Sequence, residues 1–192
     1  MADAVYTIGH STHRVEKLIA LLNEQGVTAL CDVRSTPYSR MNPQFNRESL
    51  KGALSGAGIG YVFLGAEPGA RSEDKSRCRG GQVQFDLLAR TELFLRGIER
   101  VLTGARRYRV ALMCAEKEPL DCHRTILVSR SLFEGGVPVR HILADGTTED
   151  HAQAIQRLVA MMRIPGSDMF RSDAVVEREA YERRGGGNRV PG

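Results

Sequence analysis

The sequence lacks any run of the roughly 18 apolar residues that a membrane-spanning helix needs. Its start, Met1–Ala4, has neither the basic residues nor the apolar stretch of a secretory signal peptide. We therefore expect a cytoplasmic protein with no membrane partner. Hydrophobic residues make up 42% and charged residues 26% of the 192 residues, which is typical of a folded globular domain and excludes wholesale disorder.

Cysteine and lysine are both scarce. None of the four cysteines belongs to a Cys-x-x-Cys pair, and thiols stay reduced in a chain without an export signal. This excludes a disulfide framework and leaves thiol chemistry or metal binding. Lysine accounts for four of the 27 basic residues, so 23 are arginines. The planar fork of arginine suits phosphate and carboxylate, which favours an anionic partner, but an arginine-rich genome explains the same bias equally well.

Apolar runs alternate with helical patterns along the chain. Strands are predicted over 5–8, 27–33, 59–64, 109–113 and 137–143. Helices are predicted from a cap at Thr12 to Gly26, over 46–55, over 87–102, from a cap at Asp121 to Glu134, and from a cap at Thr148 to Arg163. This alternation predicts right-handed crossovers and a mostly parallel sheet of about five strands. We expect a single α/β domain over residues 1–164, Rossmann-like and three-layered.

Two segments have no place in this alternation. Residues 65–82 are rich in glycine and charge, which is typical of a functional lid or a disordered loop. Residues 165–192 form a charged tail that contains a run of three glycines near its end. We expect the tail to be partly helical or flexible, and an oligomer would form through it.

Polar side chains follow the predicted strands at the point where each strand ends. In open α/β sheets, ligands bind outside the carboxyl ends of the strands. We therefore expect a common hollow there. The residues expected to bind substrate or an anion are Ser11, Arg34, Ser39, Arg40 and Arg124. Tyr38 or Phe45 could stack on a base, although we assign Phe45 to the core.

The segment from Cys114 to Arg124 carries the sharpest local pattern. A strand leads through a short turn into a helix that begins with Cys122, His123 and Arg124. A helix start attracts anions, so Arg124 either helps to bind an anion or forms an ion pair with a nearby carboxylate. His10, Glu116 and His123 are the candidate catalytic residues, because histidine and glutamate can transfer protons.

The cysteines of this segment allow three interpretations. Cys114 can be a small buried hydrophobe, which is the commonest role of such a residue. Cys114 or Cys122 can instead be a nucleophile, because a thiol beside a histidine and a helix start has a lowered pKa. A metal site with His123 is the third interpretation and ranks last, because an adjacent cysteine and histidine rarely reach the same zinc ion. No metal ligand is therefore predicted, and no cofactor is assigned.

The chain resembles the family called domain of unknown function 488 over roughly residues 5–145. The resemblance lies in Thr7–Ser11, in Asp32–Arg34 with Pro37 and Ser39–Arg40, in Gly58–Tyr61, and in Met113–Glu116 with Cys122–Arg124. It implies a Rossmann-like α/β domain with a polar pocket at the strand ends, and it implies no reaction.

Three functions fit these residues. The first is an enzyme that acts on a phosphate-bearing substrate, such as a nucleotide or a nucleic acid, with the proton-transferring groups named above. The second is a non-catalytic module that binds a nucleotide or nucleic acid through the same basic residues. The third is a cysteine-dependent transferase. We favour the enzyme, with an anionic small molecule or a nucleic acid as its partner.

Overall fold

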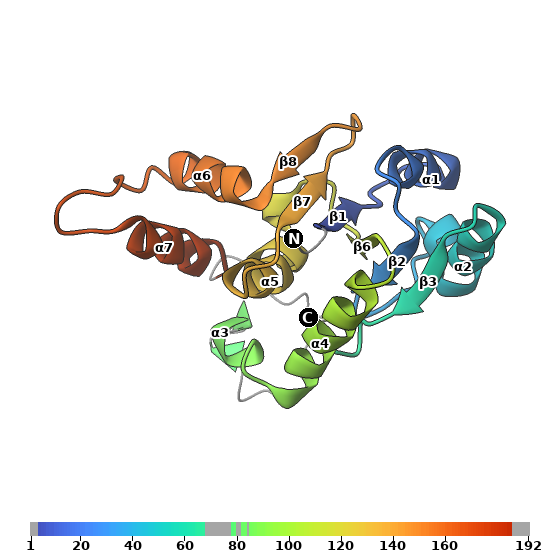
Figure 1. Ribbon diagram of the computed structural model, residues 1–192, viewed down its shortest axis with the longest axis horizontal. Coiled ribbons are helices and arrows are strands. Elements are labelled where there is room, and N and C mark those ends of the chain that lie inside the picture. The colour runs from blue at the N-terminus through green and yellow to red at the C-terminus, as the bar shows by residue number, and fades with distance from the viewer. Residues whose placement is uncertain (1–3, 68–77, 80–81, 84, 186–192) are drawn as a thin grey trace.

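The computed structural model describes residues 4–67, 78–79, 82–83 and 85–185 (Figure 1). A six-stranded sheet in the order β3-β2-β6-β1-β7-β8 forms the centre of the protein. Its strands are β1 (Val5–Gly9), β2 (Ala29–Asp32), β3 (Gly60–Phe63), β6 (Val110–Cys114), β7 (Val139–Ile142) and β8 (Thr148–Asp150). All neighbouring strands are parallel except β7 and β8. A separate antiparallel pair consists of β4 (Cys78–Arg79) and β5 (Gln82–Val83). The predicted α/β class and mostly parallel sheet are confirmed, with six strands in place of about five.

Apolar side chains form a cluster on each face of the sheet. On one face, α1 (Val15–Glu24) and α2 (Arg47–Gly56) cover the sheet with buried leucines. The other cluster contains residues of α4 (Glu92–Ala105), α5 (Arg130–Glu134), α6 (His151–Met161) and α7 (Asp173–Gly185). None of the described helices is long and apolar enough to cross a membrane.

The central strands have the composition that burial on both faces requires. Every residue of β1 and of β6 is buried, and such continuous apolar runs are typical of parallel strands that helices cover on both sides. In the register, Gly9 lies beside Cys114 and Asp32 lies beside Met113. The carboxyl ends of β1, β2 and β6 therefore meet at one edge of the sheet.

Several predicted helix boundaries are wrong. Thr12 does not cap the first helix, because that helix begins at Val15 after Arg14. The predicted helix over 87–102 is two helices, α3 (Phe85–Leu88) and α4, because the hydroxyl of Thr91 accepts a hydrogen bond from the backbone of Phe94 and starts a new helix. Thr148 begins β8, and Asp150 caps α6 through a reciprocal capping box.

The predicted helix from Asp121 to Glu134 is also interrupted. The segment consists of a 3₁₀ turn, η3 (Pro119–Asp121), a π-helical stretch, η4 (Arg124–Ser129), and then α5. Asp121 therefore ends a turn and does not cap the helix. Single π-helical turns are rare and occur frequently at functional sites.

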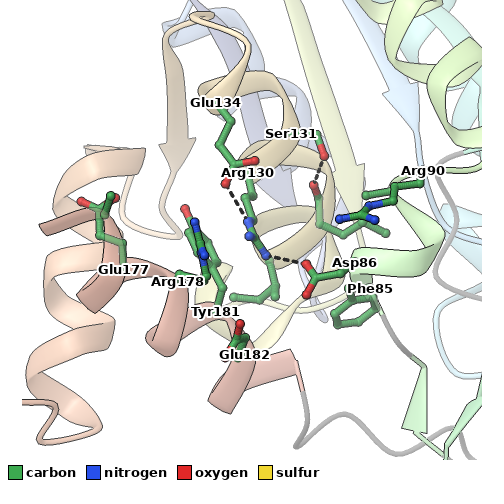
Figure 2. A pocket seen from close by; sticks show the side chains of 14 residues that line it. Phe85, Asp86, Arg90, Arg130, Ser131, Glu134, Glu177, Arg178, Tyr181 and Glu182 are labelled. Atoms are coloured by element: carbon green, nitrogen blue, oxygen red, sulfur yellow. Dashed lines mark hydrogen bonds and ion pairs between the residues drawn. The ribbon is translucent and has the colours of Figure 1, made fainter. Parts of the chain in front are cut away.

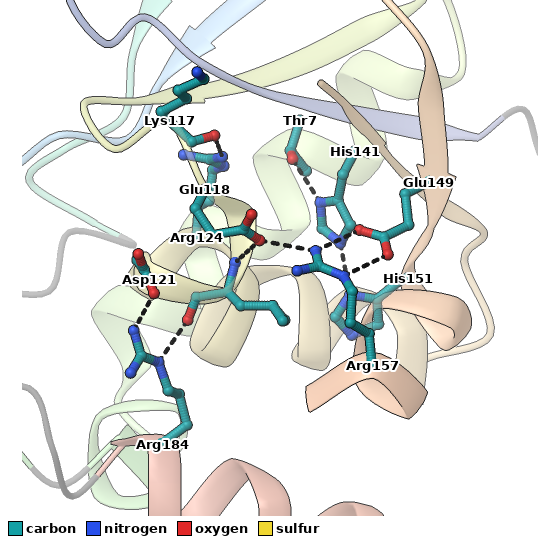
Figure 3. Close-up of polar contacts among 11 residues, drawn as sticks. Thr7, Lys117, Glu118, Asp121, Arg124, His141, Glu149, His151, Arg157 and Arg184 are labelled. Carbon is teal, nitrogen blue, oxygen red and sulfur yellow. Dashed lines mark hydrogen bonds and ion pairs between the residues drawn. The ribbon is translucent and has the colours of Figure 1, made fainter. Parts of the chain in front are cut away.

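The tail beyond residue 164 includes α7, which lies beside α6 (Figure 1). Val176, Ala180 and Tyr181 are its buried residues. Near its end, Arg184 donates to the carbonyl of Leu120 at 2.7 Å and pairs with the carboxylate of Asp121 (Figure 3). The tail helix thus holds the turn that precedes Cys122. The predicted lid falls mainly on 68–77 and 80–81, outside the described residues.

Candidate functional site

Two groups of polar side chains lie at the carboxyl ends of β1, β2 and β6. Successive side chains of a strand point to opposite faces. Met113 accordingly packs in the apolar cluster beside α1 and α2, and Cys114 packs in the cluster on the other face. We call the group on the first face the arginine cluster (His10, Asp32, Arg34, Phe45 and Tyr61) and the group on the second face the thiol cluster (Cys114, Glu116, Cys122 and His123).

Arg34 and Asp32 form a buried ion pair at the centre of the arginine cluster. Nε and Nη2 of Arg34 donate to the two carboxylate oxygens of Asp32 at 2.9 and 2.6 Å, and Nη2 also donates to the carbonyl of Phe45 at 2.8 Å. Burial opposes the charge of the guanidinium, but the hydrogen bonds to Asp32 outweigh it and raise the pKa of Arg34. Tyr61 donates to the same carboxylate at 2.8 Å. Protein groups therefore use most of the hydrogen-bonding capacity of Arg34.

His10 has a protein partner at each ring nitrogen. Its Nδ1 lies 2.8 Å from the carbonyl of Ser11, and its Nε2 lies 3.1 Å from Nη1 of Arg34. Since the guanidinium can only donate, Nε2 accepts and Nδ1 carries the proton. The ring stacks on Phe45 at 4.3 Å between centroids. Burial and the charge of Arg34 lower the pKa of His10 to about 4, so the ring is neutral at neutral pH.

The thiol cluster brings four metal-ligating or nucleophilic groups together. The sulfur of Cys114 lies 3.7 Å from Nδ1 of His123, and the sulfur of Cys122 lies 3.8 Å from it. Oε2 of Glu116 lies 3.2 and 3.1 Å from the same two sulfurs. Cys114 is 3% and Cys122 1% exposed, whereas Glu116 is exposed at the surface. Both thiols are thus covered, and the carboxylate is the side of the cluster that faces solvent.

The pKa values of the two thiols are shifted in opposite directions. A hydrogen bond to Cys122 and burial raise the pKa of Cys114. Burial opposes a charge on Cys122 as well, but the thiol of Cys114, the guanidinium of Arg124 and the ring of His123 lower the pKa of Cys122. Of the two thiols, Cys122 therefore takes a negative charge more readily. That charge, acting against the effect of burial, raises the pKa of His123.

Arg124 is a fully buried guanidinium next to the thiol cluster. Its Nη1 donates to the backbone oxygen of Glu116 at 2.7 Å, and Nη2 lies 3.5 Å from the oxygen of Lys117 (Figure 3). Within the part of the chain that the structure describes, its Nε has no partner and no carboxylate lies within ion-pair distance of it. Only glycine leaves room at position 9 for the backbone oxygen of Glu116 that Arg124 binds, because a Cβ there would lie 1.8 Å from this oxygen. The ion pair, one of the two roles considered for Arg124, is therefore absent among the described residues.

One protein-family model matches the chain. Residues 14–131 match the family described as "Domain of unknown function DUF488". The protein belongs to the DUF488 family. The match includes the whole thiol cluster and Arg34, and it begins after His10. No curated protein and no solved structure matches the chain.

The remaining predicted residues of this DUF488 protein lie in the loops around the same edge. Ser11 donates its backbone N–H to Ala115 at 2.9 Å and so ties the loop after β1 to the loop after β6. Ser39 accepts from the backbone of Asn42 within its own loop at 3.1 Å. Arg40 is exposed, and Phe45 is buried as predicted. The predicted residues thus gather at one edge, but across two faces of the sheet. The binding and catalytic roles assigned to them stay predictions.

Sequence reasoning missed a buried chain of hydrogen bonds on the DUF488 fold. Thr7 Oγ1 lies 2.7 Å from His141, His141 lies 3.0 Å from His151, and His151 lies 2.8 Å from the hydroxyl of Tyr181 (Figure 3). Both histidines stood apart from the candidate site in the sequence, away from the predicted strand ends that carry its residues. Their partners come from β1, α6 and α7, and no local pattern signals such distant contacts.

Two cavities of this DUF488 protein lie away from the predicted residues. One, of about 820 Å³, is bounded by α3, α5 and α7, with Arg130 between Asp86 and Glu134 and over the ring of Tyr181 (Figure 2). The other, of about 1050 Å³, lies between β3 and α4. Neither is lined by a predicted site residue.

Proposed function

We propose that this DUF488 protein is an enzyme that acts on a phosphate-bearing substrate at the carboxyl ends of β1 and β6, with the thiol cluster as its reacting centre. The observation that supports this proposal most strongly is the position of Glu116. This exposed carboxylate lies against two buried thiols at the edge of a parallel sheet where α/β proteins bind their ligands. Convergent groups of this kind are what an active site requires.

Positive charge near Glu116 supports an anionic substrate. Lys117 is exposed and follows Glu116 directly. Burial, together with the nearby charges of Lys117 and Lys17, lowers the pKa of His13. Nε2 of His13 is a buried nitrogen without a partner among the described residues. Because protein groups use most of the donors of Arg34, and because Arg124 is 0% exposed, we assign the contacts to a phosphate group to His13, Lys17 and Lys117.

The cysteine-dependent transferase is the second candidate function. It is favoured by the position of Cys122, whose sulfur lies beside His123 and 3.5 Å from the backbone N–H of Arg124. It is disfavoured by burial, since a nucleophile must reach its substrate and Cys122 is almost fully covered. A transferase predicts that iodoacetamide alkylates Cys122 much faster than the buried Cys31, with mass spectrometry as the readout.

A set of phosphate esters tests the proposal. The purified protein is incubated with p-nitrophenyl phosphate, bis(p-nitrophenyl) phosphate and nucleotides, and product release is measured. Glu116→Gln should lower turnover by about two orders of magnitude or more, which is the usual effect of removing a group that transfers protons. Lys117→Ala should raise KM.

The matched control is Glu118→Gln. Glu118 is two residues away and pairs with Arg157 at 2.8 Å, outside the thiol cluster. Its replacement should leave turnover unchanged. Unchanged turnover in Glu116→Gln, or hydrolysis of none of these esters by the wild type, would reject the proposal. Steeply salt-dependent binding to DNA or RNA without turnover would instead support the binding module.

A further inference from the structure

The thiol cluster has the donor atoms of a transition-metal site. The sulfurs of Cys114 and Cys122 and a ring nitrogen of His123 all lie within 4.8 Å of one another. Oε2 of Glu116 lies 3.2 and 3.1 Å from the two sulfurs, on the side of the cluster that faces solvent. The argument that an adjacent cysteine and histidine seldom reach one ion does not hold here, because Cys122 and His123 both point into the cluster.

The distances fit a tetrahedral ion. Zinc binds sulfur at about 2.3 Å and imidazole nitrogen or carboxylate oxygen at about 2.0–2.2 Å, so neighbouring donors of a tetrahedral site are about 3.6 Å apart. The sulfur–nitrogen distances are 3.7 and 3.8 Å, and the sulfur–oxygen distances are 3.2 and 3.1 Å. These four distances differ from the tetrahedral value by no more than about half an ångström.

Backbone groups next to the cluster orient His123 and Cys122 for metal binding. Nε2 of His123 lies 3.3 Å from the carbonyl of Val33, and a carbonyl can only accept. Nε2 therefore carries the proton and leaves Nδ1 free to bind an ion, the arrangement in which metal-binding histidines are held. The backbone N–H of Arg124 points at the sulfur of Cys122 at 3.5 Å.

The positive charge of the buried Arg124 would be balanced by the net charge of a zinc-loaded cluster. Two thiolates and one carboxylate around a divalent cation carry one net negative charge. Arg124 is 0% exposed and supplies one positive charge, with no carboxylate partner among the described residues. A buried charge without a counter-charge is costly. A loaded site next to it provides that counter-charge.

We infer that the thiol cluster binds one Zn²⁺ ion through Cys114, Cys122 and His123, with Glu116 beside a fourth, solvent-facing position. The inference deepens the proposed function, on whose site it rests, by naming the cofactor. Thiolate ligands select zinc over magnesium and calcium. Binding displaces the thiol protons to solvent and transfers no electrons. A substrate oxygen can approach the ion at the fourth position, because this position faces solvent beside the carboxylate of Glu116.

Metal analysis of the full chain, purified without a metal-affinity step, tests the inference. We expect about one zinc per chain. After removal of the zinc, titration with Co²⁺ should produce the absorption bands of a tetrahedral thiolate site. Cys114→Ser and Cys122→Ser should each lose the metal and these bands. Cys31→Ser is the matched control, a buried thiol of β2 outside the cluster, and should keep both.

The outcomes separate this inference from the proposed function. Wild-type protein without zinc and without cobalt–thiolate bands overturns the zinc site, as does iron or copper in its place or equal metal loss in Cys31→Ser. If the serine variants do not fold, the cobalt spectrum of the wild type decides. Zinc-loaded protein that hydrolyses no phosphate ester overturns the proposed function alone, and turnover by metal-free protein overturns zinc as the cofactor of that reaction.

Discussion

Replacing His151 by asparagine should make the protein less sensitive to acid. The ring of His151 is fully buried between His141 and the hydroxyl of Tyr181, at 3.0 and 2.8 Å. Burial lowers the pKa of His151 from 6.5 to about 4. Between these two pH values the unfolded chain binds a proton at this position and the folded chain does not. The free energy of unfolding therefore falls as the pH falls through this window.

The magnitude follows from the size of the shift. One pKa unit corresponds to about 1.4 kcal/mol, so His151 accounts for about 3 kcal/mol over the whole window and about 2 kcal/mol between pH 7 and pH 5. Asparagine keeps one donor and one acceptor but does not titrate in this range. Other groups, such as His10, titrate in both proteins, and their contribution cancels when the losses are compared.

Urea unfolding at pH 7 and pH 5 measures the effect. The wild type should lose about 2 kcal/mol more between the two pH values than His151→Asn loses. Any destabilisation of the variant at pH 7 cancels, because each protein is compared with itself. Equal losses in the two proteins would refute the reasoning, since they would show that His151 binds protons equally in the folded and unfolded states.

Two further changes have matched controls. Gly9→Ala places a methyl group 1.8 Å from a backbone oxygen and should cost about 1–3 kcal/mol, whereas Gly52→Ala in α2 meets nothing within 4 Å and should be neutral or stabilising in thermal melts. Asp32→Asn leaves the charge of Arg34 buried without its partner and should cost about 3–5 kcal/mol in urea unfolding. Glu67→Gln breaks an ion pair with a half-exposed arginine and should cost less than about 1 kcal/mol. A comparable loss in either control would contradict the assigned cause.

The sequence predicted those strands correctly whose residues are all buried. The apolar runs that became β1, β2 and β6 predicted parallel strands, and the polar residues after them predicted the edge where the clusters lie. β8 was missed because Thr148–Asp150 is short, polar and exposed on two of its three residues. It pairs with β7 through the backbone, which no side-chain pattern reports.

The sequence predicted that the candidate residues gather at one edge of the sheet, but it did not predict their division between two clusters. Asp32 and Cys114 are the last residues of neighbouring strands, but the register places Asp32 beside Met113, and Cys114 therefore points to the other face. One expected hollow thus became two clusters on opposite faces. The partners of Arg34 and Arg124 were also unreadable, because they include backbone carbonyls brought close only by the fold. Cys114, Cys122 and His123 were visible as a local motif, whereas their convergence within 4.8 Å required the turn over Pro119–Asp121.

X-ray absorption at the zinc edge of the purified protein tests the central claim most directly. The account predicts a first shell of two sulfur atoms at about 2.3 Å and two lighter atoms at about 2.0–2.2 Å. In Cys31→Ser this shell should be unchanged. A shell of nitrogen and oxygen alone, or a sulfur signal that disappears with Cys31, would show that the four side chains at the end of β6 do not form a zinc centre.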